Sequence, residues 1–207
     1  MGNRLIIVGG FHEIIELARE SGKEIFGIID NNRTNNYMGC PVLGSDSDVE
    51  HLYNKYGEYP ILITPDNPLI RKSLYLLYSK TGFSFASLIS KNSKISSSSK
   101  INEGTVIQYG AKVSCEVSIG RFVKLNYNCN ITHNVTIGDF TTIAPNAVLL
   151  GNVEVGANCY IGANSTILPN LTICDNTIIG AGAVITRNIS EAGTYVGNPG
   201  RIVEYRE

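Results

Sequence analysis

A single histidine stands inside the most regular part of this sequence, and its position suits acid–base chemistry. His133 is the only histidine between residues 89 and 185, and it follows the apolar Ile131 by two positions. The spacing therefore puts it in a turn and not in the core. An imidazole exchanges a proton near neutral pH, so His133 is a candidate general base. The alternative is a surface histidine without a catalytic role.

A second group of candidate residues follows two apolar runs near the N-terminus. The run at residues 5–8 leads into a glycine-rich turn and a helix pattern, and the run at residues 24–30 ends in an acid. Strand, glycine-rich turn, helix and acid-ended strand are half of a nucleotide-binding βαβ unit. The helix start would direct N–H groups toward a phosphate. The candidate ligand-binding residues here are Gly9, Gly10, Phe11, His12, Asp30 and Asn31.

Two more polar residues, Asp66 and Asn67, end the next apolar run (residues 60–64) at the same predicted sheet edge. The GxGxxG fingerprint is absent, so the pattern does not imply a dinucleotide. Ordinary turn chemistry is the alternative for the whole group, because Gly and Asn favour loops in any case.

The element that must position His133 is a six-residue repeat. An apolar period of six fits neither an α-helix nor an alternating strand, and fixed-period repetition indicates a solenoid. Six residues make one short strand and one turn, so three such units close one triangular coil. Every sixth residue is aliphatic: Ile89, Ile95, Ile101, Ile107, Val113, Ile119, Leu125, Ile131, Ile137, Ile143, Leu149, Val155, Ile161, Ile167, Ile173, Ile179 and Ile185.

Small residues accompany each aliphatic one. The position four residues later is expected to share the interior, and it is usually Ser, Thr, Ala or Cys, as at Thr105, Cys129 and Ser165. The position directly after the aliphatic residue is often Gly, which we expect to serve turns through its tolerance of positive φ. These glycines are Gly120, Gly138, Gly156, Gly162 and Gly180.

The first part of the chain reads as an α/β domain. Residues 31–39 read as a polar loop. A helix is expected at about 47–56 with Ser45 or Asp46 as its cap, and another begins at Pro68. A last strand at 83–90 leads into the repeat. We therefore expect a Rossmann-like domain at residues 1–85 and a parallel β-helix with a C-terminal tail at 86–207.

The composition of the chain excludes several classes of protein. The chain has 207 residues, a net charge of −1 and 43% hydrophobic residues, so no basic field argues for nucleic acid. No apolar run is long enough to span a membrane, and the N-terminus lacks a signal-peptide core. None of the five cysteines forms a CxxC pair, and Cys129 and Cys159 are expected to be buried and reduced. These features favour a cytoplasmic protein.

The motifs of the whole chain resemble the PglD/NeuD-like sugar acetyltransferases of the hexapeptide-repeat acyltransferase superfamily. The motifs are Ile-Val-Gly-Gly-Phe-His (7–12), Ile-Ile-Asp-Asn-Asn (28–32), Thr-Pro-Asp-Asn (64–67), Ile-Thr-His-Asn (131–134), Gly-Asp-Phe-Thr-Thr (138–142), Leu-Leu-Gly-Asn-Val (149–153) and Val-Gly-Asn-Pro-Gly-Arg (196–201). The resemblance implies a left-handed β-helix, a homotrimer, acetyl-CoA bound between neighbouring β-helices and a nucleotide sugar held by the N-terminal domain.

The resemblance also implies roles for individual residues. His133 falls on the family's catalytic base, Asn134 follows it, and Gly151 falls where a backbone N–H stabilises the oxyanion. The family usually has an acid where this chain has Asn134 and a second histidine where it has Thr142. The residues that would line the CoA site are Thr142, Gly151, Ala163, Gly180, Ala181 and Arg201.

Four functions are compared on this basis. The first is N-acetylation of a UDP-linked 4-amino-4,6-dideoxy sugar, and the second is O-acetylation of a sialic acid or related sugar. A hydroxyl needs a stronger base than an amine, so the missing acid beside His133 favours the first. A non-catalytic nucleotide-sugar-binding protein is the third. A β-helix carbonic anhydrase is rejected, because its zinc needs three histidines and the repeat holds one, and no metal is expected.

Overall fold

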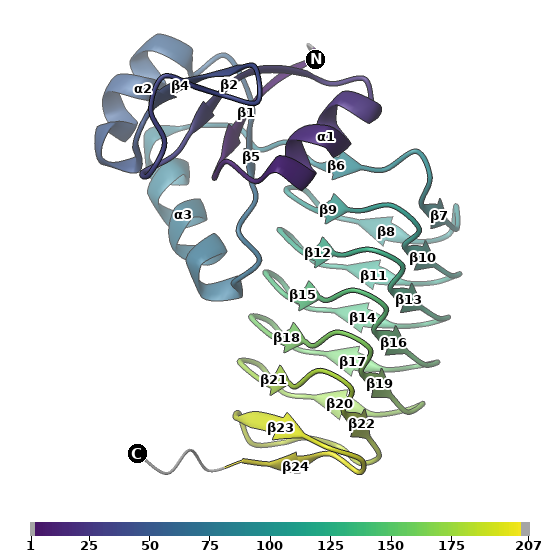
Figure 1. Cartoon of the computed structure of the whole chain (residues 1–207). Helices are drawn as coiled ribbons and strands as arrows, with labels where there is room; N and C mark the ends of the chain where they lie inside the picture. The colour runs from purple at the N-terminus through teal and green to yellow at the C-terminus, as the bar shows by residue number, and fades with distance from the viewer. Residues whose placement is uncertain (1–2, 204–207) are drawn as a thin grey trace. The chain divides into compact units, whose positions relative to one another are not determined.

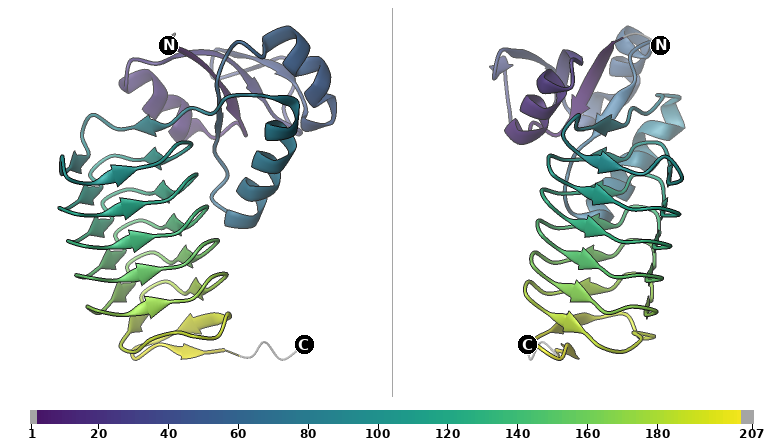
Figure 2. Two further views of the ribbon diagram at one scale, coloured as in Figure 1. Left: turned by 180° about the vertical axis from the view of Figure 1, so that it is seen from behind. Right: turned by 90° about the vertical axis from the view of Figure 1, so that its right-hand side faces the viewer.

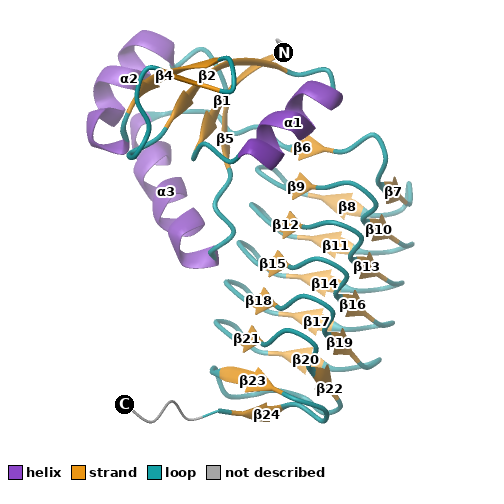
Figure 3. Cartoon of the chain, in the orientation of Figure 1, coloured by secondary structure: helices purple, strands orange, loops and turns teal. Residues whose placement is uncertain are grey.

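The computed structural model describes residues 3–203, and the chain divides into two compact units, residues 1–91 and 92–207 (Figure 1). The sequence placed the boundary earlier, at 85/86. Residues 84–86 still belong to the first unit, because the Ala86 N–H donates to the Ile61 carbonyl at 2.8 Å and Phe85 bridges to Ile61. Helices occur only in the first unit of the described chain (Figure 3).

The N-terminal unit is an α/β sheet whose strands lie in the order β3-β4-β2-β1-β5. Strands β1, β2, β4 and β5 pair in parallel, while β3 and β4 form an antiparallel hairpin. The elements are β1 (Arg4–Val8), α1 (His12–Glu20), β2 (Glu24–Ile29), β3 (Asn36–Tyr37), β4 (Cys40–Gly44), the 3-10 helix η1 (Asp46–Asp48), α2 (Val49–Tyr56), β5 (Ile61–Ile63), α3 (Pro68–Thr81) and β6 (Leu88–Ile89).

Three local expectations for this unit need correction. Residues 31–39 were expected to be a polar loop only, yet β3 lies within them and pairs with β4 across a turn in which Met38 and Gly39 have positive φ. Neither Ser45 nor Asp46 caps a helix through its side chain. Asp46 is instead hydrogen-bonded to Asn31 and to Tyr78 of α3, as described below. The expected strand at 83–90 is reduced to a bridge at Phe85 and to β6.

The C-terminal unit is a left-handed parallel β-helix in which each coil contributes one strand to each of three faces (Figure 2). Paired residues are separated by 18 positions, as in the pair Asn134 and Asn152. Face 1 holds β7 (Lys94–Ile95), β10 (Lys112–Val113), β13 (Asn130–Ile131), β16 (Val148–Leu149), β19 (Thr166–Ile167) and β22 (Val184–Ile185). Face 2 holds β8 (Lys100–Ile101), β11 (Ser118–Ile119), β14 (Thr136–Ile137), β17 (Glu154–Val155) and β20 (Thr172–Ile173).

Face 3 closes each coil and ends in a hairpin. Within residues 92–203 its strands are β9 (Val106–Ile107), β12 (Lys124–Leu125), β15 (Thr142–Ile143), β18 (Tyr160–Ile161), β21 (Ile178–Ile179), β23 (Thr194–Val196) and β24 (Arg201–Ile202). The last two strands, β23 and β24, are antiparallel, whereas the other neighbouring strands of the three faces pair in parallel. The chain thus runs from face 1 through face 2 to face 3 in every coil.

The repeat builds the core as expected, and its first coils are packed less tightly than the later ones. The aliphatic residues from Ile107 to Ile185 are buried in one apolar cluster, whereas Ile95 and Ile101 are partly buried and Ile89 is 38% exposed. Cys129 and Cys159 are fully buried free thiols, and burial raises the pKa of Cys129 to about 12 and that of Cys159 to about 11. The core cysteines therefore act as small apolar groups.

The expected reason for the recurrent glycines was wrong. Gly120, Gly138 and the other glycines of that position do not have positive φ. Glycine is needed at this position because the coils stack closely. A Cβ on Gly138 would lie 2.5 Å from the Ala157 backbone nitrogen. The left-handed turn position lies two residues later and is mostly Asn, whose short polar side chain tolerates that conformation. Its asparagines are Asn128, Asn134, Asn146, Asn152, Asn158, Asn164, Asn170 and Asn176.

Candidate active site

His133 lies in the turn between β13 and β14, at the corner that joins face 1 to face 2. Its side chain is exposed, and its carbonyl accepts a hydrogen bond from the Asn152 N–H at 3.0 Å. The equivalent turn position is Cys115 one coil earlier and Gly151 one coil later. The backbone ladder therefore stacks His133 directly against Gly151.

The imidazole packs on the backbone of Gly151. A Cβ at Gly151 would lie 2.4 Å from His133 Cε1 and 2.6 Å from Nε2, so only glycine leaves room for the ring. Gly151 is buried, and within residues 3–203 no hydrogen-bond acceptor is recorded for its N–H. A buried amide without a partner is uncommon. The corner thus combines a proton acceptor with an unused backbone donor.

Asn134 serves the turn. Its φ is +60°, and its side-chain amide donates to Asn152 Oδ1 at 2.9 Å. Asn152 in turn donates to Asn170 Oδ1 at 2.8 Å, which forms an asparagine ladder along the corner. Over the described chain, no hydrogen bond or ion pair reaches the His133 imidazole, so the ring is positioned by packing on Gly151.

Gly151 packs against His133, but the other residues expected to line a CoA site lie away from it in a single protomer. Thr142 begins β15 on face 3, and Ala163, Gly180 and Ala181 lie at the corner that joins face 3 to face 1. This corner and the His133 corner are at opposite ends of face 1. Arg201 is exposed on β24, where its Nη1 donates to the Gly200 carbonyl at 3.0 Å.

The N-terminal unit holds a pocket of ≈ 610 Å³ at the carboxyl ends of β1 and β2. Six expected residues line it together: Gly9, Gly10, Phe11, His12, Asp30 and Asn31. Asp66 and Asn67 are not in its lining. Asn67 caps α3 instead, because its Oδ1 accepts from the N–H groups of Leu69 at 2.9 Å and Ile70 at 3.2 Å.

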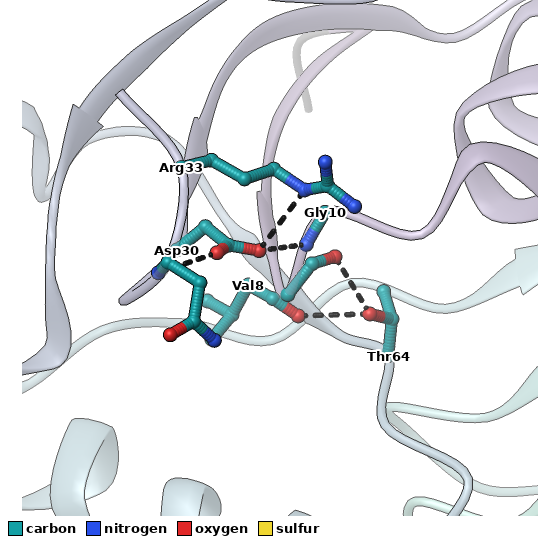
Figure 4. Close-up of polar contacts among 7 residues, drawn as sticks. Val8, Gly10, Asp30, Arg33 and Thr64 are labelled. Atoms are coloured by element: carbon teal, nitrogen blue, oxygen red, sulfur yellow. Dashed lines mark hydrogen bonds and ion pairs between the residues drawn. The ribbon is translucent and has the colours of Figure 1, made fainter.

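Hydrogen bonds with Asp30 and Thr64 hold the glycine-rich turn in place (Figure 4). The Gly10 N–H donates to Asp30 Oδ2 at 2.7 Å, and the Asn32 N–H donates to Asp30 Oδ1 at 2.9 Å. Thr64 Oγ1 donates to the carbonyl oxygens of Val8 and Gly9, each at 2.9 Å. Asp30 therefore holds the loops of β1 and β2 together, in addition to any contact with a ligand.

A second polar network joins two residues of the pocket lining, Asn31 and Asp46, to Tyr78 of α3. Asn31 Nδ2 donates to Asp46 Oδ2 at 2.8 Å, and the Asp46 N–H donates back to Asn31 Oδ1 at 2.9 Å. Tyr78 donates its hydroxyl to Asp46 Oδ1 at 2.5 Å. Burial and this bond raise the pKa of Tyr78 well above its ordinary value, so the hydroxyl keeps its proton.

Sequence reasoning missed three polar residues of the pocket lining, Asn32, Arg33 and Asp46. Arg33 stands in a polar loop that carries no periodic signal, and Asp46 was assigned to a helix cap. The only available hint was that residues 31–33 continue directly from the carboxyl end of a buried strand, where such folds place their ligand contacts.

No helix within residues 3–203 is long and apolar enough to cross a membrane. No group of three or more His, Cys, Asp or Glu side chains in the same part of the chain is arranged to hold a metal ion.

Comparison with known proteins agrees with this fold. The model of the bacterial transferase hexapeptide family (six repeats) matches residues 116–151 and 152–187. A variant of GDP-perosamine N-acetyltransferase from Caulobacter crescentus, in complex with CoA and GDP-perosamine, is 25% identical with a TM-score of 0.91. That match covers 99% of this chain and 98% of that one. The search of curated proteins gives no significant match.

Two further structures are similar over nearly the full length. The acetyltransferase domain of PglB from Neisseria gonorrhoeae FA1090, in complex with acetyl coenzyme A, is 27% identical with a TM-score of 0.91, covering 98% of this chain and 100% of that one. WeeI from Acinetobacter baumannii AYE is 28% identical with a TM-score of 0.83, covering 97% and 100%.

An α/β unit followed by a left-handed hexapeptide β-helix defines the class, and the repeat match and the full-length similarities agree on it. The expected resemblance to PglD/NeuD-like sugar acetyltransferases is confirmed, and the chain is an enzyme of this type.

Proposed function

We propose that this protein transfers the acetyl group of acetyl-CoA to the amino group of a nucleotide-linked 4-amino-4,6-dideoxy sugar, with His133 as general base. The observation that carries the proposal is the imidazole of His133 packed on Gly151, beside an unused backbone N–H. The similarity to an N-acetyltransferase of GDP-perosamine and to an acetyl-CoA-bound acetyltransferase domain supports the substrate classes.

The reaction is direct transfer. The sugar nitrogen attacks the thioester carbonyl carbon, and the Gly151 N–H donates to the oxyanion that forms. His133 removes the proton from the attacking nitrogen. When the tetrahedral intermediate collapses, the carbon–sulfur bond breaks, CoA leaves as its thiolate, and the imidazolium returns the proton to the sulfur. The products are the N-acetylated sugar nucleotide and CoA.

An amine acceptor suits this site better than a hydroxyl. No carboxylate of residues 3–203 contacts the His133 imidazole, and Asn134 is bonded to Asn152. An imidazole without an acidic partner is a weaker base, and an amine needs less help than an alcohol to attack a thioester. O-acetylation of a sialic acid is therefore the less favoured reaction.

The residue types at the corner and in the tail expected to bind CoA are compatible with that role. Ala163, Gly180 and Ala181 leave the backbone of the face 3–face 1 corner uncovered, and the exposed Arg201 can meet a phosphate. For the nucleotide, uridine diphosphate is the expectation from sequence. The perosamine enzyme binds a GDP-sugar, so both nucleotides belong in the substrate panel.

The test is release of the CoA thiol from acetyl-CoA with a panel of UDP- and GDP-linked 4-amino sugars and sialic acid. On the best acceptor, His133→Ala should lower kcat by about 10²–10⁴-fold, the usual loss for a general base. His133→Asn should lose as much, since it keeps a hydrogen bond but cannot take the proton. KM for both substrates should change little. Retention of more than about a third of kcat, far above the general-base range, would show that the proton is removed elsewhere.

A further inference from the structure

The glycine-rich turn of the N-terminal pocket has few free N–H groups that could donate to a phosphate. The Gly9 N–H donates to the Ile29 carbonyl at 2.9 Å, the Gly10 N–H to Asp30 Oδ2 at 2.7 Å, and the Phe11 N–H to the Gly9 carbonyl at 2.9 Å. These donors are used by the protein itself. Of the N–H groups of residues 9–13, only those of His12 and Glu13, which open α1, have no acceptor within residues 3–203.

The charge of the pocket lining also disfavours the binding of a phosphate. Two carboxylates line it, Asp30 and Asp46, and Arg33 is the single Lys or Arg side chain in that lining. A nucleoside diphosphate brings further negative charge into this space. The carboxylates would repel it unless a cation stands between them and the phosphates.

Arg33 is placed to be that cation. Its Nε lies 3.6 Å from Asp30 Oδ2, and its guanidinium carbon lies 3.5 Å from the centre of the Tyr37 ring. A Cβ on Gly10 would lie 2.7 Å from Arg33 Nε, so the guanidinium rests directly over the glycine-rich turn. The stacked ring holds the plane of the guanidinium, which lowers the entropy lost when it binds.

The terminal nitrogens of Arg33 are unused. No hydrogen bond or ion pair of Nη1 or Nη2 is recorded within residues 3–203, and both nitrogens point away from the Asp30 carboxylate (Figure 4). Asp30 therefore orients the guanidinium through Nε and leaves the outer pair of donors for another acceptor. Such a pair matches two oxygens of one phosphate.

We infer that Arg33 binds the diphosphate of the sugar nucleotide, with Asp30 and Tyr37 holding its guanidinium in place over Gly10. This inference rests on the proposed function and assigns the phosphate contact within it. Arg33 sets affinity for the phosphorylated part of the substrate and takes no part in acetyl transfer. The nucleoside part is bound by other residues of the pocket.

The test compares the binding of UDP with uridine, and of GDP with guanosine, to the full chain by calorimetry without acetyl-CoA. Arg33→Gln should weaken binding of the preferred diphosphate by about 10–100-fold, the range for loss of a charged hydrogen-bond pair. Its nucleoside should bind as to wild type. Arg33→Lys should lie between the two, because it keeps the charge and loses the planar fork.

Arg4→Gln is the matched control. Arg4 also forms one ion pair, with Glu24 at 2.8 Å in the same unit, but it is not in the pocket lining. The control should bind the diphosphate as wild type does. Equal loss in both variants would mean that only net charge matters, and equal loss of nucleoside and diphosphate in Arg33→Gln would mean that Arg33 only supports Asp30.

The inference is also overturned if wild type binds neither diphosphate, or if Arg33→Gln binds the preferred one unchanged. A melting curve with the wild-type midpoint shows that a variant is folded. If Arg33→Gln is not folded, Arg33→Lys replaces it in the binding test. Because binding is measured without acetyl transfer, the test of Arg33 is independent of the test of the proposed acetyltransferase function. Arg33-dependent diphosphate binding without turnover of any amino sugar would remove the proposed function and keep the inference.

Discussion

His133 and Gly151 form one structural pair in this protein. The ring of His133 is held by the surface of Gly151, and no polar contact of the described chain holds it otherwise. The same glycine keeps its buried N–H unused. A side chain at residue 151 would therefore disturb both the base and the oxyanion donor.

We predict that Gly151→Ala lowers kcat by about 10–10³-fold, because the loss of one oxyanion donor or of base alignment each has this order of effect. The backbone of Gly151 is not left-handed, so alanine fits its conformation, and only the exposed imidazole has to move. The melting temperature should stay near that of wild type. Steady-state kinetics and a thermal melt check the two halves of this prediction.

Pro169→Ala is the control for Gly151→Ala. Pro169 occupies the same turn position one coil later, and it is exposed. This variant should keep wild-type kcat. If Gly151→Ala also keeps it, the packing of His133 on Gly151 has no part in catalysis.

The turns of the β-helix are stabilised as a set by left-handed asparagines. Asn134, Asn152 and Asn170 have φ of +60°, +60° and +61°, and their side chains bond in series at 2.9 and 2.8 Å. Asparagine tolerates this conformation, and its amide both donates and accepts along the corner. The corner that carries His133 is thus reinforced by its own turn residues.

We predict that Asn152→Ala lowers the free energy of unfolding by about 1–2 kcal/mol, since it adds left-handed strain and removes both ladder bonds. Asn152→Gly should lose roughly half as much, because glycine removes the strain and loses only the bonds. Denaturant titration of both variants measures the difference. Equal stability of the alanine and glycine variants would contradict the assigned strain.

Apart from Gly151, the residues expected to bind CoA do not lie beside the expected base in one copy of the chain. His133 and Gly151 lie at one end of face 1, and Ala163 and Ala181 lie at the other. A trimer, as the family resemblance implies, would supply the second half of the site from a neighbouring copy.

Light scattering should therefore give a mass three times the 22.5 kDa of one chain at micromolar concentration. Mixing His133→Ala with Ala181→Arg, a change meant to block the CoA corner, should restore part of the activity, because mixed trimers contain some intact sites. A fully active monomer, or the absence of complementation between inactive variants, would contradict a site shared between copies.

The β-helix and the edge that carries the pocket were predictable from sequence. Each hexapeptide repeats the same local requirements, an aliphatic residue inward and a small one beside it, so seventeen weak signals add to one strong pattern. Gly9, Gly10 and Asp30 were found because strand ends of a parallel sheet share one edge. Local order along the chain is sufficient for both predictions.

Contacts between distant side chains had no such local pattern. Nothing in the loop at 31–37 showed that Arg33 would stack on Tyr37 over Gly10, or that Asp46 would join Asn31 and Tyr78. The glycines after each aliphatic residue were recognised, but their cause, close stacking of coils, depends on atoms 18 residues away. Such contacts depend on rotamers and on the register between segments, and these exist only once the chain has folded.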